Sequence, residues 1–149
     1  MRCRVLSVLP DSAQLEWVKD ILEAELTNII FDFTTNEAKA LEKLNSRTYE
    51  LIVTSLDIPK DGKDLAWEGL RRGLGLARWA ENHNVNIRTI LLAKVGDADL
   101  DKALVRLERC ELVILKLGWE DLFIKRVRQT LAGEAPPERK RLDVDIRLY

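Results

Sequence analysis

Two side chains of different chemistry, Ser55 and Asp57, follow a short apolar run in the segment LIVTSLDIPKDG, residues 51–62. A carboxylate at the end of a buried strand can accept a phosphoryl group if Mg²⁺ neutralises the crowded oxygens around it. A serine hydroxyl is neutral at pH 7, so it neither attracts the metal nor forms an acyl phosphate. The position of each residue relative to the strand therefore decides whether this segment handles phosphate.

The spacing of Ser55 and Asp57 leaves two interpretations of the aspartate open. Residues two apart on an extended strand point to the same side, so Asp57 can reach the pocket of Ser55 from one pleat further along. In that case Asp57 is a phosphoacceptor that works with Mg²⁺. Alternatively, Asp57 is a turn or cap residue, which is a common role for aspartate after a strand.

The elements that must position these residues alternate along the chain. Apolar runs predict strands over 3–9, 29–34, 49–56, 87–93 and 111–117, and amphipathic segments predict helices over 11–26, 35–48, 74–84, 97–110 and 119–133. The strands are continuous Val, Ile and Leu runs, which indicates a sheet covered by helices on both faces. Right-handed connections then give a three-layer α/β/α, doubly wound parallel sheet of five strands.

Ligands bind such sheets outside the carboxyl ends of the strands. At these ends the sequence places Asp11, Ala93 and Lys116, together with Ser55 and Asp57. Two roles are open for Lys116. It forms an ion pair with one of the aspartates and fills the space of a phosphate or metal, or it buries its stem and keeps its ammonium group in water.

Five strand–helix units in about 130 residues resemble the CheY-like receiver domain of bacterial response regulators. YELIVTSLDIP is similar to the third strand of that family, in which the phosphoacceptor aspartate stands four residues before a proline. Counting back four from Pro59 and forward six from Tyr49 both lead to Ser55. The resemblance implies a flavodoxin-like sheet with strand order 2-1-3-4-5, and a degenerate pocket with serine in the place of the acceptor.

The other family positions show the same loss. Receivers end their first strand with an acidic pair that holds Mg²⁺, whereas here only Asp11 follows that strand. Receivers end the fourth strand with a hydroxyl residue, and this chain has Leu92 or Ala93 there. Only the lysine of the fifth strand has a counterpart, in Lys116. The resemblance implies a pseudo-receiver that is not an enzyme and has no catalytic or metal-binding residues, with Mg²⁺ as a cofactor only if Asp57 is phosphorylated.

The segment after the third predicted strand is longer than the family pattern. The glycine that opens the third helix, Gly73, lies fourteen residues after the proline instead of four, so residues 60–72 form an apparent insertion. Long loops in compact domains are often functional, and a tryptophan flanked by arginines is typical of a binding hot spot. Trp67, Arg71 and Arg72 therefore belong either to a lid over the degenerate pocket or to an interaction loop.

The chain of 149 residues is long enough for one domain with a substantial core, which we place at residues 1–133. Residues 134–149 begin with a proline pair, which suggests a linker, and end in an alternating segment over 141–149 that predicts a half-buried strand. A lone strand is not stable. It therefore extends the sheet, pairs with another subunit or leads into a further domain.

Charge and hydropathy exclude several classes of partner. The 24 basic and 25 acidic residues are balanced, which argues against a nucleic-acid surface. The apolar runs are far shorter than the roughly 20 residues that cross a bilayer, and the first residues lack the features of a signal peptide. We therefore expect a cytoplasmic protein that binds neither nucleic acid nor membrane.

Three functions remain in competition. The favoured one is a non-catalytic signalling domain of a two-component or related bacterial system, which binds a protein partner or effector domain without phosphorylation. The alternatives are an active phosphotransfer receiver that uses Asp57, and a small-ligand-binding flavodoxin-like domain. A homodimer is expected through the tail 141–149, or through the face of the fourth helix, fifth strand and fifth helix. That face has mixed charge from Arg106, Arg109, Lys125, Arg126, Arg128, Glu108, Glu120 and Asp121.

Overall fold

Strands and helices alternate strictly along the described part of the chain. The computed structural model describes residues 3–83 and 86–132, so the predictions for 134–149 lie outside the described residues. The strands are β1 (Cys3–Val8), β2 (Ile29–Thr34), β3 (Leu51–Ser55), β4 (Arg88–Ala93) and β5 (Cys110–Ile114). The helices are α1 (Ser12–Glu25), α2 (Glu37–Ser46), α3 (Arg72–His83), α4 (Ala98–Val105) and α5 (Trp119–Leu131).

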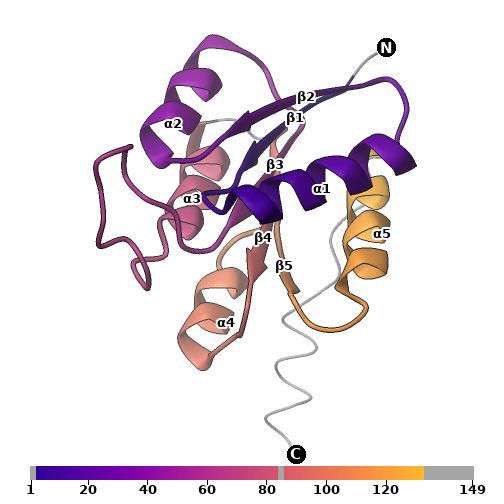
Figure 1. Ribbon diagram of the computed structural model, residues 1–149. Coiled ribbons are helices and arrows are strands. Elements are labelled where there is room, and N and C mark those ends of the chain that lie inside the picture. The colour runs from indigo at the N-terminus through magenta and orange to yellow at the C-terminus, as the bar shows by residue number, and fades with distance from the viewer. Residues whose placement is uncertain (1–2, 84–85, 133–149) are drawn as a thin grey trace, which may run out of the picture.

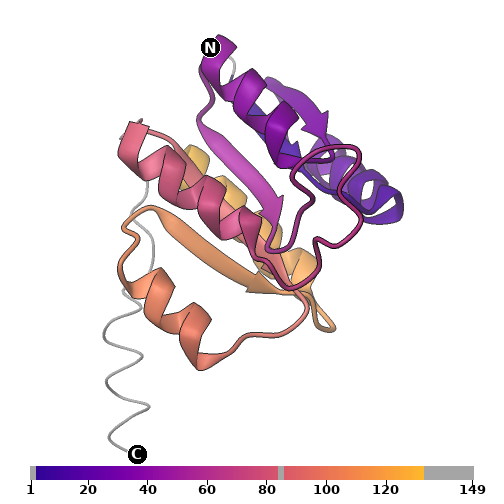
Figure 2. The same ribbon diagram turned by 90° about the vertical axis from the view of Figure 1, so that its left-hand side faces the viewer.

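The five strands form one parallel sheet in the order β2-β1-β3-β4-β5. Helices α1 and α5 cover one face, and α2, α3 and α4 cover the other (Figures 1 and 2). The three-layer, doubly wound fold and its predicted strand order are therefore confirmed. The order reverses direction between β1 and β3, so the crevice expected for ligands lies at the carboxyl ends of these two strands.

Alternate strand residues pack on opposite faces because side chains change sides at every residue. Under α1 and α5 the apolar core contains Val5, Val53, Ile90, Val113 and Phe123, all essentially inaccessible to solvent. The opposite core has two parts, one under α2 and α3 and one under α3 and α4. Since both faces of the sheet are apolar, the continuous Val, Ile and Leu runs of the sequence are explained.

Most predicted elements end one or two residues early in the structure, and β5 and α4 end three and five residues earlier than the sequence predicts. Strand β5 stops at Ile114, because the N–H of Lys116 turns back to donate to the Ile114 carbonyl at 2.9 Å. Helix α4 stops at Val105, and its last turn tightens through a hydrogen bond of 3.2 Å from the N–H of Arg106 to the Ala103 carbonyl. These shorter elements displace residues that the sequence places at the pocket edge, Lys116 above all.

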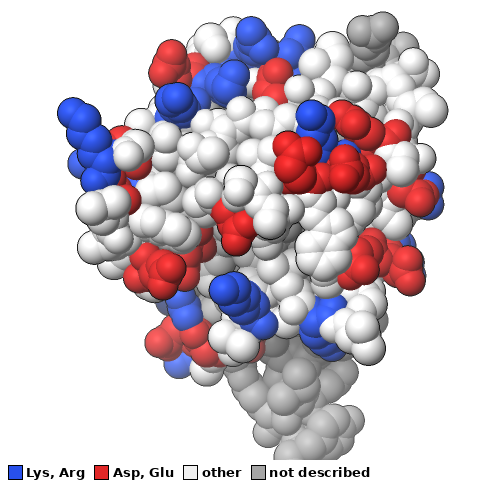
Figure 3. All heavy atoms as spheres, in the orientation of Figure 1, with Lys and Arg blue, Asp and Glu red and all other residues white. Residues whose placement is uncertain are grey.

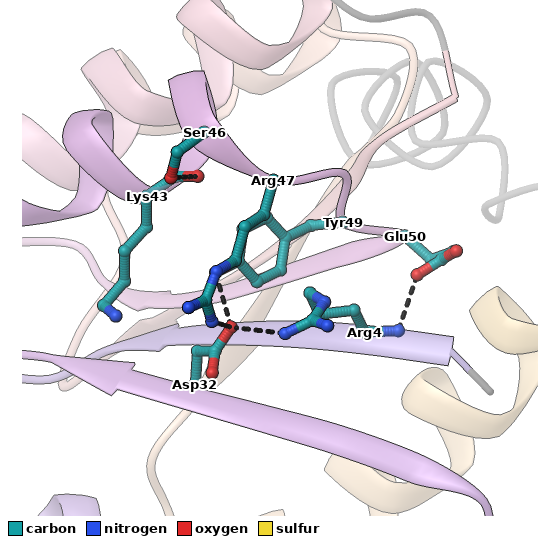
Figure 4. A network of polar contacts seen from close by, with 7 residues as sticks. All are labelled: Arg4, Asp32, Lys43, Ser46, Arg47, Tyr49 and Glu50. Atoms are coloured by element: carbon teal, nitrogen blue, oxygen red, sulfur yellow. Dashed lines mark hydrogen bonds and ion pairs between the residues drawn. The ribbon is translucent and has the colours of Figure 1, made fainter.

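A polar network crosses the edge of the sheet under α2 (Figure 4). One carboxylate oxygen of Asp32 in β2 accepts hydrogen bonds from the Tyr49 hydroxyl at 2.6 Å, from Arg4 at 3.1 Å and from Arg47 at 3.2 Å. Burial by itself raises the pKa of Asp32, and these three donors outweigh it, so the net pKa is lowered. Burial, and then the bond to Asp32, raise the pKa of Tyr49 to about 12. The network joins β1, β2 and the approach to β3.

The face of the molecule in Figure 3 shows no broad field of one sign. On this face, basic and acidic side chains are interspersed with wide areas of uncharged surface. Within residues 3–83 and 86–132, no helix combines the length and apolarity needed to cross a membrane. Specific contacts therefore matter more for recognition on this face than long-range attraction.

Candidate functional site

A pocket of about 590 Å³ lies at the carboxyl edge of the sheet. Its lining comes from the ends of β1, β3, β4 and β5, from the start of α1 and from the loop between β3 and α3, which runs across the strand ends (Figure 2). The lining residues are Pro10, Asp11, Gln14, Ser55, Leu56, Asp57, Trp67, Glu68, Gly69, Arg71, Leu92, Ala93, Lys94, Val95 and Leu115. This is the position at which open α/β sheets bind ligands.

Ser55 ends β3 at the floor of this pocket and is only 9% exposed. Its hydroxyl donates a hydrogen bond of 2.9 Å to the side-chain carbonyl Oε1 of Gln14, on the first turn of α1. Reasoning from the sequence missed Gln14. Its signal was its place three residues after the cap of a helix whose first turn must overhang the carboxyl edge. The hydroxyl is thus occupied by a neutral amide rather than directed at an incoming ligand.

Asp11 caps helix α1 from the pocket wall. Its Oδ1 accepts the N–H groups of Ala13 at 2.9 Å and Gln14 at 3.1 Å. An aspartate in this position satisfies N–H groups that have no partner within the helix, and its charge complements the helix dipole. Asp11 is thus the N-cap residue of helix α1, which runs from Ser12.

Asp57 has the turn role that was one of its two interpretations. Its Oδ1 accepts the backbone N–H of Arg71 at 2.9 Å, which closes the loop between β3 and α3. Beside it, the Leu56 carbonyl accepts the N–H of Gly73 at 2.9 Å. The chain thus leaves the sheet after Ser55 and returns within hydrogen-bonding distance of Asp57 at Arg71. That residues 60–72 are an insertion relative to the family stays a prediction.

The remaining two predicted pocket residues differ in their placement. Ala93 ends β4, is buried and lines the pocket. Lys116 is exposed beyond the end of β5 and does not line the pocket, and Leu115 occupies that wall instead. The ammonium group of Lys116 forms no ion pair with any residue in the described ranges. The early end of β5 is the reason, so the placement of Lys116 in the pocket is corrected.

The acidic groups of the pocket do not assemble a metal site. Mg²⁺ requires several oxygen ligands in near-octahedral geometry, usually including converging carboxylates. Among the residues that the structure describes, no group of three or more His, Cys, Asp or Glu side chains is placed to hold a metal ion. Asp11 and Asp57 each direct an oxygen to backbone N–H groups. The donor set therefore does not fit Mg²⁺, and no phosphotransfer step is assigned to it.

An ion pair between Arg71 and Asp97, called the clasp below, joins the loop to helix α4. The backbone of Arg71 is left-handed, with φ of 56°, and its guanidinium binds both carboxylate oxygens of Asp97. Asp97 also caps α4, because its Oδ1 accepts the N–H of Leu100 at 2.8 Å. The hydrogen bond from Arg71 and then the one from Leu100 lower the pKa of Asp97. The clasp is thus charged at neutral pH and weakens only as pH falls through the lowered pKa of Asp97.

The other residues of the predicted interaction loop have distinct positions. Arg72 donates to Asp64 at 2.7 Å, and Asp64 also accepts the N–H of Lys60 at 3.0 Å, so this arginine holds the loop together. Trp67 is half-buried and lines the pocket. Leu65, by contrast, is 94% exposed. The loop therefore forms one wall of the pocket, and its two arginines are engaged within the chain.

Breaking the clasp is expected to loosen this wall. In an Asp97→Asn variant the side-chain oxygen can still cap α4, whereas the charged pairing with Arg71 is lost. We expect amide hydrogen exchange over residues 67–71 to accelerate on the order of tenfold, since local opening depends on few contacts. Exchange in β3 and β4 should stay unchanged. Hydrogen exchange followed by mass spectrometry measures both.

The matched control for the clasp is Glu25→Gln. It removes the ion pair between Glu25 and Arg128, 2.8 Å apart on α1 and α5, which lies away from the loop. This variant should leave exchange over 67–71 at the wild-type rate. An equal rate in the Asp97→Asn variant and the wild type would mean that the clasp does not hold the wall.

Several charges on the face expected to form a dimer are paired within the chain. Arg126 lies 3.2 Å from Glu111, and Arg128 lies 2.8 Å from Glu25. The guanidinium of Arg109 donates to the backbone carbonyl of Glu81 in α3 at 3.2 Å, and the backbone N–H of Arg109 donates to the Glu81 carboxylate at 3.0 Å. Pairing of this kind rigidifies the face. It also leaves fewer charges to select a second copy than the sequence suggested.

Comparisons with known proteins place the fold. No protein-family model and no curated protein matches the sequence. Among solved structures, the signal receiver domain of an HD domain-containing protein from Pseudomonas fluorescens Pf-5 has a TM-score of 0.71 at 19% identity, with 89% of this chain and 97% of that chain covered. The signal receiver domain of a histidine kinase from Syntrophus aciditrophicus has a TM-score of 0.69 at 21% identity, with 88% and 91% covered.

A third structure is the response regulator protein TrrA from Thermotoga maritima in complex with Mg²⁺ and BeF. It has a TM-score of 0.66 at 22% identity, and the match covers 87% of this chain and 99% of that chain. At such identities a structural likeness establishes architecture rather than activity. The chain therefore has the fold of response regulator receiver domains.

Proposed function

We propose that this chain is a receiver-like signalling domain of a two-component or related system, and that it acts by binding a protein partner or effector domain without being phosphorylated. The observation that carries the proposal is the state of Ser55. This residue, at the position expected for the acceptor, is buried, neutral and hydrogen-bonded to Gln14. A serine has no carboxylate with which to form an acyl phosphate, and the hydroxyl of this one is already hydrogen-bonded, so no catalytic residue is assigned.

Phosphorylation of Asp57 is the competing proposal. Two features weigh against it. Asp57 already fixes the loop through the N–H of Arg71, and within the described residues carboxylates do not converge beside it for Mg²⁺. A phosphoryl group on Asp57 would carry up to two negative charges, in the pocket that the carboxylates of Asp11 and Glu68 also line. Without a metal, repulsion between these charges opposes the transfer.

Incubation with Mg²⁺ and acetyl phosphate separates the two proposals. We expect the intact mass of the protein to stay unchanged, and its tryptophan fluorescence not to respond to Mg²⁺ with beryllofluoride, because Ser55 and the pocket carboxylates offer no acceptor site. An Asp57→Ala variant is the control. A gain of one phosphoryl group in the wild type that disappears in Asp57→Ala would replace the present proposal with the phosphotransfer one.

Partner binding is proposed at the surfaces that the fold leaves accessible. The rim of the pocket offers exposed apolar side chains, with Leu70 at 55% and Val95 at 74% exposure. Exposed apolar groups that adjoin a polar cleft are typical of interaction sites. The face of α4, β5 and α5 is the proposed surface for a homodimer, in keeping with the half-buried Leu112 and Ile114 of the edge strand β5.

Ligand binding is a second candidate function, and the pocket itself is the observation that favours it. A volume of about 590 Å³ is within the range of small-molecule sites. The pocket combines an indole, several aliphatic side chains and a few polar groups, which is the usual composition of such sites. Which ligand it suits depends on the hydrogen-bonding groups left over in its wall.

A further inference from the structure

Several hydrogen-bond donors at the pocket already donate to other groups of the chain. The N–H groups of Ala13 and Gln14, at the N-terminus of α1, donate to Asp11. The N–H of Arg71 donates to Asp57, and the hydroxyl of Ser55 donates to the amide of Gln14. Such helix-terminal and loop N–H groups are those that bind anions in other α/β folds. Here they are satisfied by groups of the chain.

By contrast, several carboxylate oxygens of the pocket accept no hydrogen bond from the described residues. Asp11 and Asp57 each engage only Oδ1, and in the described part of the chain their Oδ2 atoms accept no hydrogen bond. Glu68 also lines the pocket, forms no hydrogen bond or ion pair with any described residue and is exposed. A carboxylate accepts through both oxygens. The wall therefore presents three carboxylates with unused acceptor capacity.

The net charge of the lining residues is also negative. The guanidinium of Arg71 is neutralised by Asp97, which lies outside the lining. Lys94 is then the one basic group of the lining without a described carboxylate partner, and it is exposed. With Arg71 and Lys94 both counted, the lining has three carboxylates and two basic groups, so its net charge is −1. Charge complementarity therefore favours a cationic ligand over an anionic one.

The apolar residues of the lining favour a ligand that has an apolar stem. Trp67 is half-buried and lines the same pocket as the aliphatic side chains of Leu92, Val95 and Leu115. An indole face attracts a guanidinium or ammonium group, and attracts it more strongly where water is partly excluded. The aliphatic side chains suit a methylene stem. A ligand with a cationic head and an apolar stem thus suits both the charged and the apolar residues of the lining.

We infer that this pocket binds an organic cation, a guanidinium or ammonium group on an aliphatic stem, between Trp67 and the carboxylates of Asp11, Asp57 and Glu68. The cation comes from a free amine or from an arginine or lysine side chain of the protein partner. The inference deepens the proposed function and rests on it in one respect, because Asp57 must remain unmodified to serve as an acceptor.

Three probes of similar size and different charge test the inference directly. They are n-butylguanidinium, pentanamide and pentanoate, which have a cationic, a neutral and an anionic head. Titrations followed by tryptophan fluorescence and by amide chemical shifts should show n-butylguanidinium binding about tenfold or more tightly than the other two. The largest changes in chemical shift should map to residues 55–57 and 67–71.

Variants that keep the geometry and remove the charge locate the site. In the triple variant Asp11→Asn, Asp57→Asn and Glu68→Gln, the first two side chains still accept the N–H groups that they now cap. Affinity for n-butylguanidinium should fall about tenfold, since charge pairs in a partly buried site are the main attraction. The control removes three exposed carboxylates outside the lining, with Asp20→Asn, Glu23→Gln and Glu42→Gln, and should bind as the wild type does.

A Trp67→Leu variant tests the indole separately. It keeps apolar volume and removes the aromatic face, so affinity for n-butylguanidinium should fall several-fold while pentanamide binding changes little. The source of the cation is distinguished by comparing agmatine with the blocked peptide acetyl-Leu-Arg-Leu-amide. Tighter binding of agmatine identifies a free amine as the ligand class, and tighter binding of the peptide identifies a partner side chain.

Two results would overturn the inference. One is a preference for pentanoate, or no binding of any cation at millimolar concentration. The other is equal cation affinity in the triple variant and its control. Neither result touches the proposed function, which is decided by the intact mass after treatment with acetyl phosphate. A protein that is not phosphorylated and binds no cation would retain the interaction role and lose only this ligand class.

Discussion

Replacing Gly73 with alanine is expected to destabilise the protein by about 3 kcal/mol and to lower its melting temperature by roughly 10 °C. A Cβ atom at this position would overlap the backbone carbonyl oxygen of Ser55 and lie 2.9 Å from that of Leu56. Both neighbours are backbone atoms at the end of a central strand. They cannot rotate aside as a flexible side chain would, so the clash must be relieved by moving helix α3 or strand β3.

The higher helix propensity of alanine opposes this destabilisation, but its effect is smaller. Alanine inside a helix is favoured over glycine by about 1 kcal/mol, which on its own would stabilise α3. The close approach is held in place by the hydrogen bond of 2.9 Å from the N–H of Gly73 to the Leu56 carbonyl. Moving the helix would stretch that bond and tilt the loop wall that Arg71 anchors. The cost of the clash therefore exceeds the gain in helix propensity.

Gly75→Ala is the matched control, in the same helix and two residues away. The nearest atom to a Cβ there is the Glu37 Oε2, at 3.9 Å, which is an ordinary contact. This variant should be neutral or more stable by up to about 1 kcal/mol, so the two glycines should give effects of opposite sign. Thermal unfolding measures both. Equal melting temperatures for the two variants would contradict the close approach of α3 to β3.

The architecture was predictable because it depends on patterns repeated many times. Every strand is an apolar run and every helix has a periodic apolar face, so small errors at the ends do not change the topology. Strand β2 was predicted at its observed bounds, Ile29–Thr34. Asp11, Asn36 and Asp97 lie within the first two residues of predicted helical segments, and in the structure they cap α1, α2 and α4 by accepting helix N–H groups.

The site was predictable only in part, because it depends on single residues. Ser55 was placed correctly at the end of β3, since Tyr49 and Pro59 gave the same count. Lys116 was misplaced because the run ELVILKL looks like strand up to residue 117, while β5 turns at Ile114. The contact of Gln14 with Ser55 and the clasp of Arg71 with Asp97 join residues 41 and 26 positions apart. No local pattern contains information on such pairs.

The second large effect is expected for Tyr49→Phe, which should lower the free energy of unfolding by about 2 kcal/mol at pH 7. Tyr49 is 1% exposed, and its hydroxyl donates to Asp32 at 2.6 Å. A hydrogen bond to a charged, partly buried group contributes about 1.5–3 kcal/mol. The ring of phenylalanine fills the same space, so the variant removes the bond and leaves no cavity.

The pH dependence of this effect follows from the direction in which each pKa moves on folding. Tyr49 has its pKa raised to about 12, from an ordinary value of 10.0. A raised pKa means that the folded state holds the proton more tightly. The contribution is therefore complete below about pH 9 and is lost as pH rises through 10 towards 12.

Asp32 makes the stability depend on pH in the acidic range. Burial raises its pKa, and the donors Tyr49, Arg4 and Arg47 lower it further than burial raises it, so its net pKa lies below the ordinary value of 3.8. A lowered pKa means that the folded state favours the carboxylate. Its contribution is complete above the ordinary carboxyl range and is lost as pH falls through the lowered pKa.

The two titrations together predict a plateau. The stability difference between wild type and Tyr49→Phe should be greatest from about pH 5 to 9, and should shrink on both sides, because the bond needs a protonated phenol and an ionised carboxylate at once. Urea unfolding at a series of pH values measures the difference, in which titrations common to both proteins cancel.

Arg47→Met is the graded control for this network. The Arg47 side chain is 50% exposed and lies 3.2 Å from Asp32, so screening by water should limit its loss to less than about 1 kcal/mol. Its effect should also persist above pH 10, since the guanidinium stays charged there. If instead Tyr49→Phe and Arg47→Met cost the same at every pH, the buried phenol would not be the dominant donor. The network at the edge of the sheet would then be held by its arginines.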